Sequence, residues 1–268
     1  MIPKVINYVW LSGEEKPKLI QDCIASWHRV MPDYQIREWT MEDVKHIESN
    51  FLHDALEAQK WAFCTDFLRF YIIYNYGGIY MDSDVYAYKP LDDLLNCEGF
   101  TALEGSGILW PEQMNKIQDF GLEAAVFGAS KGSQWVKHIL NFYSDLKFRN
   151  DSDFFLKIIA PKVMWERSLP FGLRKVPSFQ LLDGDVKIYP LDTISCVADF
   201  SLYGKDLSDP YKIGDINPLR YVCHMCCNSW GWKPKKTLKD KTKDFIIRLI
   251  GTERAVSYKR KFKSLIKP

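Results

Sequence analysis

The stretch of this chain that most constrains its fold comprises residues 61–85. Its first half repeats aromatic and aliphatic residues at helical spacing, which predicts an amphipathic helix. Gly77 and Gly78 follow, and glycine tolerates the positive φ angle at which many helices end. The apolar run 79–81 then predicts a short buried strand. The chain is therefore expected to pass from a helix through a glycine stop into the core of a sheet.

Four charged residues make this stretch a candidate site. Asp82 and Asp84 follow the predicted strand with one residue between them, so in extended chain their carboxylates point to the same face. Asp66 and Arg69 are three positions apart on the predicted helix and lie on one side of it. Carboxylates are rarely buried without a partner, because desolvating a charge is costly. We expect a divalent cation at the aspartate pair, with all four groups within reach of one ligand.

Other interpretations of the aspartate pair remain open at this point. Asp-Ser-Asp is ordinary turn chemistry. A pair of aspartates also suits a nuclease, a phosphatase or a calcium-binding loop.

The beginning of the chain predicts an α/β domain with parallel strands. Residues 5–11 indicate a strand, 17–31 a helix and 34–39 a second strand. In open parallel sheets, ligands bind beyond the carboxyl ends of the strands. Trp10 and Asp82 both fall at such ends.

The rest of the chain continues this alternation. The predicted segments are a helix at 50–60, strands at 100–104 and 122–129, a helix at 133–148, a helix at 154–165 interrupted at Pro161, and strands at 186–189 and 221–224. Residues 105–118 contain glycine and proline without periodicity and predict a mobile loop.

His224 ends the last predicted strand and is a candidate metal ligand, although a lone histidine after a strand is often structural. The nearby Cys223, Cys226 and Cys227 suggest zinc, but a zinc site of this kind needs a second cysteine pair that the sequence lacks. The seven cysteines have no regular spacing, which is typical of reduced thiols in a cytosol.

Charge is distributed unevenly along the chain. From Lys233 onward there are 13 Lys/Arg against 3 Asp/Glu, whereas the preceding body has 23 against 31. We therefore predict a domain at 1–232 and a basic tail at 233–268. Apolar residues at helical spacing within the tail favour an amphipathic helix on an anionic membrane surface over a solvated helix that caps the domain. The acidic body argues against nucleic acid as a partner.

The sequence predicts neither a secretory signal at its start nor a membrane span, because no apolar run is long enough for either. We expect a cytoplasmic protein that associates peripherally with the inner face of the plasma membrane.

Three blocks of this sequence together resemble glycosyltransferase family thirty-two, the DXD sugar transferases that include capsular-polysaccharide transferases and yeast Golgi mannosyltransferases. The catalytic cores of the large clostridial glucosylating toxins look similar. The resemblance covers residues 2–232 and rests on 2–10, on 65–69 with 77–84, and on His224 with 229–230. It implies a GT-A fold, with a Rossmann-like, mostly parallel sheet between helices. The implied activity is metal-dependent transfer with retention of anomeric configuration.

The resemblance also implies how the donor is bound. Val9 and Trp10 would hold the nucleotide base, with the indole stacked on it. Asp66 and Arg69 would grip the donor sugar, and Arg69 would also lie near the diphosphate. Tyr80 would contact the ribose.

A second group of residues would surround the metal. Asp82 would contact ribose and sugar and assist the ion, and Asp84 would bind the ion directly. His224 or Ser229 would complete its shell, and Trp230 would reach the bridging phosphate. The catalytic set that the resemblance implies is Asp66, Arg69 and Asp82.

The sequence departs from the family pattern in two places. Asn7 stands where many members carry histidine, which leaves the base contact open. Glu123, Ala124 and Ala125 stand where members often carry an asparagine for the donor sugar. The identity of the sugar is therefore left open.

These observations predict a retaining transferase that uses Mn²⁺ or Mg²⁺ and a UDP-hexose, with GDP-mannose the less favoured donor. The expected acceptor is a polysaccharide or a lipid-linked glycan. We expect Asp66 to bind sugar hydroxyls rather than to form a covalent intermediate. Two alternatives are a sugar-nucleotide-binding module without turnover and a two-metal phosphoesterase, the second being short of ligands with five scattered histidines.

Overall fold

The computed structural model describes residues 1–105, 120–191, 193–197 and 220–225. The chain divides into two compact units, Met1–Trp230 and Gly231–Pro268, and every described residue belongs to the first. Most of the predicted loop at 105–118, the basic tail, Ser229 and Trp230 lie outside the described residues. The domain boundary at 232 remains a prediction.

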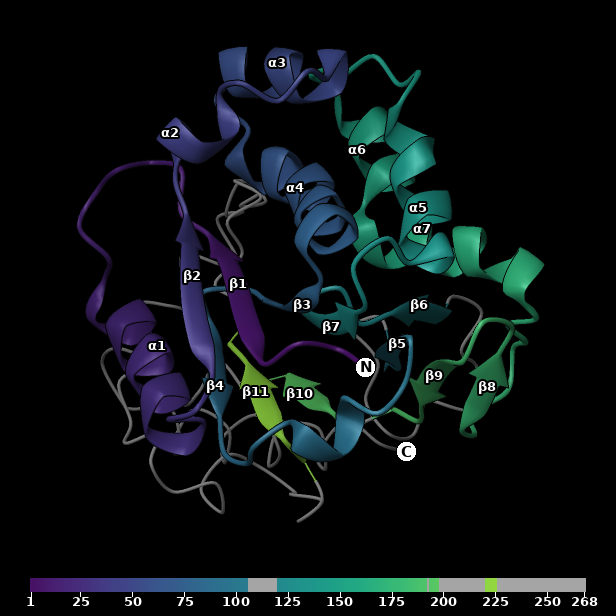
Figure 1. The fold of residues 1–268 in the computed structure, drawn as a ribbon. Helices are drawn as coiled ribbons and strands as arrows, with labels where there is room; N and C mark the ends of the chain where they lie inside the picture. The colour runs from purple at the N-terminus through teal and green to yellow at the C-terminus, as the bar shows by residue number, and fades with distance from the viewer. Residues whose placement is uncertain (106–119, 192, 198–219, 226–268) are drawn as a thin grey trace, which may run out of the picture. The chain divides into compact units, whose positions relative to one another are not determined.

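The described residues form the elements drawn in Figure 1. The helices are α1 (Lys18–Val30), α2 (Met41–Val44), α3 (Asn50–Glu57), α4 (Trp61–Tyr76), α5 (Gln134–Leu140), α6 (Ser152–Ile158) and α7 (Ala160–Ser168), with short 3-10 turns η1 (Asp92–Leu94), η3 (Asn141–Tyr143) and η4 (Leu169–Phe171). The strands are β1 (Val5–Val9), β2 (Gln35–Trp39), β3 (Gly78–Met81), β4 (Val85–Ala87), β5 (Gly99–Gly105), β6 (Phe120–Leu122), β7 (Val126–Ala129), β8 (Gln180–Leu182), β9 (Val186–Tyr189), β10 (Ser195–Val197) and β11 (Val222–His224).

The main sheet has the strand order β2-β1-β3-β7-β5-β9-β8, and β6 also pairs with β5. β1 runs parallel to β2 and β3, and β5 runs parallel to β9. The predicted α/β architecture, a sheet between helices, is confirmed, but the sheet is mixed rather than mostly parallel. β6 and β7 both run antiparallel to β5, and β7 also runs antiparallel to β3.

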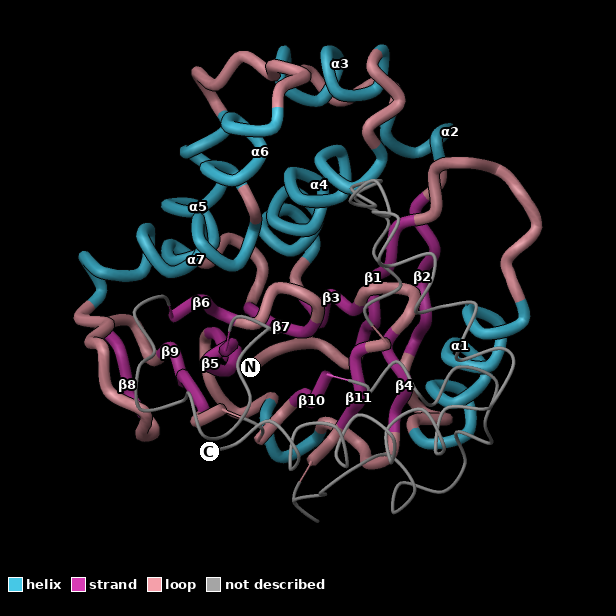
Figure 2. The backbone as a smooth tube through the Cα atoms, turned by 180° about the vertical axis from the view of Figure 1, so that it is seen from behind, coloured by secondary structure: helices cyan, strands magenta, loops and turns pink. Residues whose placement is uncertain are grey.

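Two layers cover the main sheet. Figure 1 and Figure 2 show helices α3 to α7 on one face, and α1 with the small sheet β10-β11-β4 on the other. Each face has its own apolar core: one includes Phe51, Phe67 and Phe127, and the other includes Trp27 and Met81. Among the described residues, no helix is long and apolar enough to cross a membrane.

Helix α4 fills the space between the sheet and the outer helices. Ten of its sixteen residues are buried, so it is apolar nearly all round, as expected of a helix that is covered on most sides. It ends at Gly77, whose φ angle is +71°, and Gly78 follows at +100°. The predicted glycine stop is therefore confirmed, and it delivers the chain directly into β3.

Three predicted elements differ in detail. The single strand expected at 122–129 is interrupted, because residues 123–125 leave the sheet between β6 and β7. The helix expected at 133–148 ends as α5 and then η3, at Tyr143. The interruption near Pro161 falls at Ile159, since Pro161 occupies the first turn of α7, where a missing N–H costs nothing.

Candidate functional site

The acidic residues lie in a turn just beyond the carboxyl end of β3. The Val85 amide donates to the Asp82 carbonyl at 3.0 Å, so the segment turns instead of continuing as extended chain. The expectation of two carboxylates on one face of a strand is therefore wrong in its geometry. The turn nevertheless brings both side chains together, because Asp82 and Asp84 flank it.

Asp82, Asp84 and His224 form a cluster whose ligand atoms all lie within 4.8 Å of one another. The Nε2 atom of His224 is 3.4 Å from Asp84 Oδ1 and 3.9 Å from Asp82 Oδ2. The histidine arrives on β11, which pairs antiparallel with β4 so that His224 is opposite Val85. Asp84 and His224, which are 140 positions apart in the sequence, thus lie side by side.

Cysteine plays no part in this cluster as far as the described residues extend. Cys223 is fully buried and precedes His224 on the same strand, so the two side chains point to opposite faces. Cys226 and Cys227 lie outside the described residues.

Asp66 and Arg69 form a buried ion pair beside this cluster. Arg69 Nη2 donates to Asp66 Oδ1 at 2.9 Å, and both side chains are almost fully inaccessible to solvent. Their spacing on α4 produces the pair, as predicted from the sequence. A buried pair of this kind is strongly destabilised when one partner is removed, because an uncompensated charge remains.

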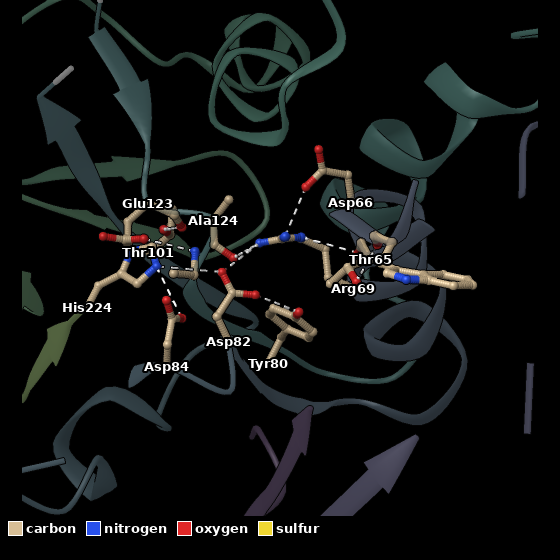
Figure 3. A network of polar contacts seen from close by, with 12 residues as sticks. Thr65, Asp66, Arg69, Tyr80, Asp82, Asp84, Thr101, Glu123, Ala124 and His224 are labelled. Carbon is tan, nitrogen blue, oxygen red and sulfur yellow. Dashed lines mark hydrogen bonds and ion pairs between the residues drawn. The ribbon is translucent and has the colours of Figure 1, made fainter. Parts of the chain in front are cut away.

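Arg69 makes contacts on all sides of its guanidinium (Figure 3). Its Nη1 atom donates to the Ala124 carbonyl at 2.6 Å and lies 3.5 Å from Asp82 Oδ2. Its guanidinium carbon lies 4.9 Å from the centre of the Tyr80 ring. Desolvation opposes the charged form, but Asp82, Tyr80 and Asp66 outweigh it and raise the pKa of Arg69. Arg69 is therefore a fixed positive charge between Asp66 and Asp82.

The two carboxylate oxygens of Asp66 differ in their hydrogen bonding. Oδ1 accepts from Arg69, whereas Oδ2 is buried and has no hydrogen-bond partner of normal geometry within the described part of the chain. The Ala160 backbone N–H also acts on this carboxylate and, like Arg69, opposes a rise in its pKa. Desolvation raises the pKa of Asp66 to about 7, against the opposing effect of Arg69. An unsatisfied buried carboxylate oxygen is costly, and a ligand hydroxyl would relieve that cost.

Tyr80 orients the first aspartate. Its hydroxyl donates to Asp82 Oδ1 at 2.7 Å, and burial raises the pKa of Tyr80, so the phenol stays protonated as a donor. The predicted residues Asp66, Arg69, Tyr80, Asp82, Asp84 and His224 thus form one continuous constellation.

The predicted base-binding residues lie at the same edge of the sheet, because β1 is parallel to β3. Val9 ends β1 and is buried, and Trp10 follows it half-buried. The indole N–H of Trp10 donates to the Glu14 carbonyl at 2.9 Å, and the Lys16 ammonium lies 5.3 Å from its ring centre. The indole is therefore held in one orientation beside the strand end.

Asn7, which departs from the family pattern, has a structural role. Its side chain is fully buried, donates to the carbonyls of Gly77 and Ile79 at 3.3 and 3.5 Å, and accepts from the Trp39 indole at 3.0 Å. These contacts tie β1 to the glycine stop and leave its amide engaged within the protein.

Sequence reasoning placed residues 123–125 in a strand and noted the absence of an asparagine there, but the structure places their backbone at the site. The Ala124 carbonyl accepts from Arg69, and the Ala125 carbonyl accepts from the Asp82 amide at 2.8 Å. Backbone acceptors carry no side-chain signature, so only the break between β6 and β7 could have indicated these two carbonyls.

Sequence reasoning also missed Glu104. Desolvation, and then the neighbouring Glu123, raise the pKa of Glu104 well above its usual range.

The sequence of this chain is similar to those of known glycosyltransferases. Residues 17–101 match a family model described as a glycosyltransferase sugar-binding region containing a DXD motif. The turn that holds Asp82 and Asp84 lies within that match. Residues 17–101 are therefore similar to the DXD sugar-binding region of glycosyltransferases, as the resemblance drawn from the sequence implies.

Two relatives are from Schizosaccharomyces pombe. Inositol phosphoceramide mannosyltransferase 3 is 26% identical over 146 residues, which is 52% of this chain and 36% of the relative. Inositol phosphoceramide mannosyltransferase 1 is 32% identical over 106 residues, which is 35% of this chain and 32% of the relative. The chain thus spans about a third of the length of these relatives. Among solved structures, the PaToxG glycosyltransferase is 16% identical with a TM-score of 0.47, covering 63% of this chain and 69% of that one.

Proposed function

We propose that this protein is a metal-dependent, retaining glycosyltransferase that moves a hexose from a UDP-sugar to a glycan or lipid-linked acceptor. One observation carries the proposal: a cluster of two carboxylates and an imidazole, all within 4.8 Å, adjoins a buried Asp66–Arg69 pair in a DXD sugar-binding region. The cluster suits a cation, and the pair suits a sugar bearing a diphosphate.

The three ligands fit a divalent ion chemically. Asp82 and Asp84 offer hard carboxylate oxygens, which both Mn²⁺ and Mg²⁺ accept, and the imidazole of His224 favours the transition metal of the two. A bound ion would stabilise the negative charge that develops on the departing diphosphate. Tyr80 contributes by fixing the orientation of Asp82, whose other oxygen is 3.5 Å from Arg69.

Asp66 and Arg69 are proposed to hold the donor sugar. The buried Oδ2 of Asp66 would accept a hydrogen bond from a sugar hydroxyl, while Arg69 holds the opposite oxygen. Because Arg69 fixes the carboxylate on one side, Asp66 is better placed as a hydroxyl acceptor than as a nucleophile. A stable glycosyl adduct on Asp66 in mass spectrometry would contradict this role.

The donor is proposed to be a UDP-hexose, with a mannosyl donor as the alternative. The names of the two yeast relatives favour the alternative, since both are called mannosyltransferases. Hydrolysis of UDP-glucose, UDP-galactose, their N-acetyl forms and GDP-mannose with Mn²⁺ would identify the donor. Release of UDP from at least one sugar nucleotide supports the proposal, and release of GDP from GDP-mannose alone selects the mannosyl donor.

The same experiment distinguishes an enzyme from a binding module. We expect Asp84→Ala to abolish nucleotide release, because that side chain belongs to the metal cluster. Tight donor binding by the wild-type protein without hydrolysis or transfer would identify a binding module instead. Equal release by wild type and Asp84→Ala would contradict the metal-dependent mechanism.

The acceptor side is proposed from sequence and relatives. The basic composition of residues 233–268, with 13 Lys/Arg against 3 Asp/Glu, supports association with the anionic inner face of the plasma membrane. The names of the yeast relatives include a phosphoceramide, which supports a lipid-linked acceptor.

Vesicle flotation tests the membrane proposal. The full chain should float with vesicles of phosphatidylcholine and phosphatidylserine at low salt and stay behind at high salt. Charge reversal at Lys259, Lys261 and Lys263 should reduce flotation at low salt. Equal binding to pure phosphatidylcholine would contradict the electrostatic mechanism.

A further inference from the structure

The segment between β6 and β7 connects the two halves of the site. Its three residues accept or donate hydrogen bonds in two directions. Toward the sheet, the Thr101 hydroxyl donates to the Glu123 carbonyl at 2.7 Å, and the Glu123 amide donates to the Ala102 carbonyl at 2.8 Å. The rear of the segment is therefore fixed to β5.

The front of the segment faces the site. The Ala124 carbonyl accepts from Arg69 Nη1 at 2.6 Å, and the Ala125 carbonyl accepts from the Asp82 amide at 2.8 Å. One of these contacts belongs to the sugar side and the other to the metal side. A displacement of the segment would therefore move both sides together.

A single side chain closes this turn. The Glu123 carboxylate accepts from the Ala125 amide at 2.8 Å, two residues along its own chain (Figure 3). Its side chain is only 5% exposed, and no described Lys or Arg pairs with it. Burying a carboxylate without a cation is costly, so a bound ion at the adjoining cluster would lower that cost.

We propose that Glu123 is a positioning residue, which holds the 123–125 turn so that its two outward carbonyls fix Arg69 and Asp82 relative to each other. The proposal rests on the proposed function, since it assigns Arg69 to the sugar and Asp82 to the metal. Glu123 acts through Ala124 and Ala125 and need not touch the donor.

The test compares substitutions that keep or remove the acceptor. Glu123→Gln retains an oxygen that can accept from Ala125, whereas Glu123→Ala removes it. We expect Glu123→Ala to raise both the donor KM and the Mn²⁺ concentration for half-maximal activity about tenfold or more, as expected for losing a hydrogen bond to a charged group. Glu123→Gln should stay within about threefold of wild type, because the hydrogen bond persists.

Ser168→Ala serves as the control for a general loss of stability. Ser168 is fully buried, and its hydroxyl accepts from the Trp135 indole and donates to the Met164 carbonyl. Its loss should lower Tm while leaving donor KM and Mn²⁺ dependence unchanged. If Glu123→Ala does not fold, Glu123→Met keeps the side-chain length, removes the acceptor and takes its place.

A second readout does not depend on activity. Hydrogen exchange of the Asp82 amide reports directly on its bond to the Ala125 carbonyl. Exchange should accelerate in the alanine or methionine variant and remain slow in the glutamine variant. If wild type transfers and hydrolyses no sugar nucleotide, the proposed function fails, but this exchange measurement still decides the role of Glu123. Unchanged Asp82 protection in the variants that lack the acceptor would overturn the proposal.

Discussion

Arg69 Nη1 lies 3.5 Å from Asp82 Oδ2, and this contact joins the buried ion pair of α4 to the acidic turn after β3. The same nitrogen donates to the Ala124 carbonyl. Because one guanidinium serves both sides, its planar geometry matters as much as its charge.

Arg69→Lys should keep the positive charge and lose the planar guanidinium group, which donates in several directions at once. Lysine has one ammonium group and cannot contact Asp66, Ala124 and Asp82 together in the observed geometry. We expect kcat/KM to fall about a hundredfold or more, in line with losing several charge-assisted hydrogen bonds. Steady-state kinetics with the active donor measures this. Arg29→Lys, an exposed position on α1 where Arg29 bonds the Tyr86 hydroxyl, should leave kinetics unchanged.

Removal of the metal should mimic loss of its ligands. Treatment with EDTA should abolish nucleotide release, and added Mn²⁺ should restore it. Asp84→Asn should lower kcat about a hundredfold or more, because it removes one of the negative charges that would hold the ion. Asp22→Asn, which affects only an ion pair with Lys18 on α1, is the control. Full activity of Asp84→Asn in EDTA would contradict the assignment.

Asp66 should make stability depend on pH. Desolvation raises its pKa to about 7 from 3.8, so between these values the folded protein binds more protons than the unfolded chain. The free energy of unfolding therefore falls as pH rises through that window. Asp66→Asn lacks this titration. The stability advantage of wild type over Asp66→Asn should be larger at pH 5 than at pH 8.

Guanidinium chloride unfolding at both pH values measures this difference. Asp54→Asn, at an exposed position of α3, should show the same pH dependence as wild type. A gap between wild type and Asp66→Asn that does not change with pH would show that Asp66 is ionised throughout.

Gly77→Ala should destabilise the fold more than its backbone angle alone requires. A Cβ atom there would lie 2.7 Å from the Lys131 amide nitrogen, in addition to the strain of φ +71°. Gly184 has a similar φ of +75° with nothing within 4 Å of a Cβ, so Gly184→Ala isolates the strain. We expect Gly77→Ala to cost about 2 kcal/mol more than Gly184→Ala. Thermal unfolding of the two variants gives the comparison, and equal Tm values would contradict it.

Local sequence signals predicted much of the fold. Helix α4, the glycine stop and β3 follow from periodicity and from the φ freedom of glycine, and α1, β2 and β9 lie within one residue of the predicted ends. The reversal at β7 was not predictable, because the run 122–129 carries no turn signal and pairing direction depends on distant strands. The short α5 was missed for a similar reason: amphipathic spacing continues beyond Leu140, but the chain tightens into η3 there.

The site, too, contains residues that the sequence could predict and groups that it could not. Asp66, Arg69, Asp82 and Asp84 were predictable because one local segment sets their spacing. His224 was predictable only as a candidate, since its approach depends on the pairing of β11 with β4. The carbonyls of Ala124 and Ala125 were not predictable at all, because any residue supplies a carbonyl and only the tertiary fold decides where it points.

The pairing of β11 with β4 also affects when a newly made chain can bind the proposed metal ion. A nascent chain that has passed Asp84 already holds both aspartates, but it lacks the imidazole until His224 has been synthesised and β11 has docked. Under the proposed mechanism, fragments that stop before this strand would lack one ligand of the ion and would not hydrolyse sugar nucleotide. Assembly of the metal cluster thus waits for the pairing of β11 with β4.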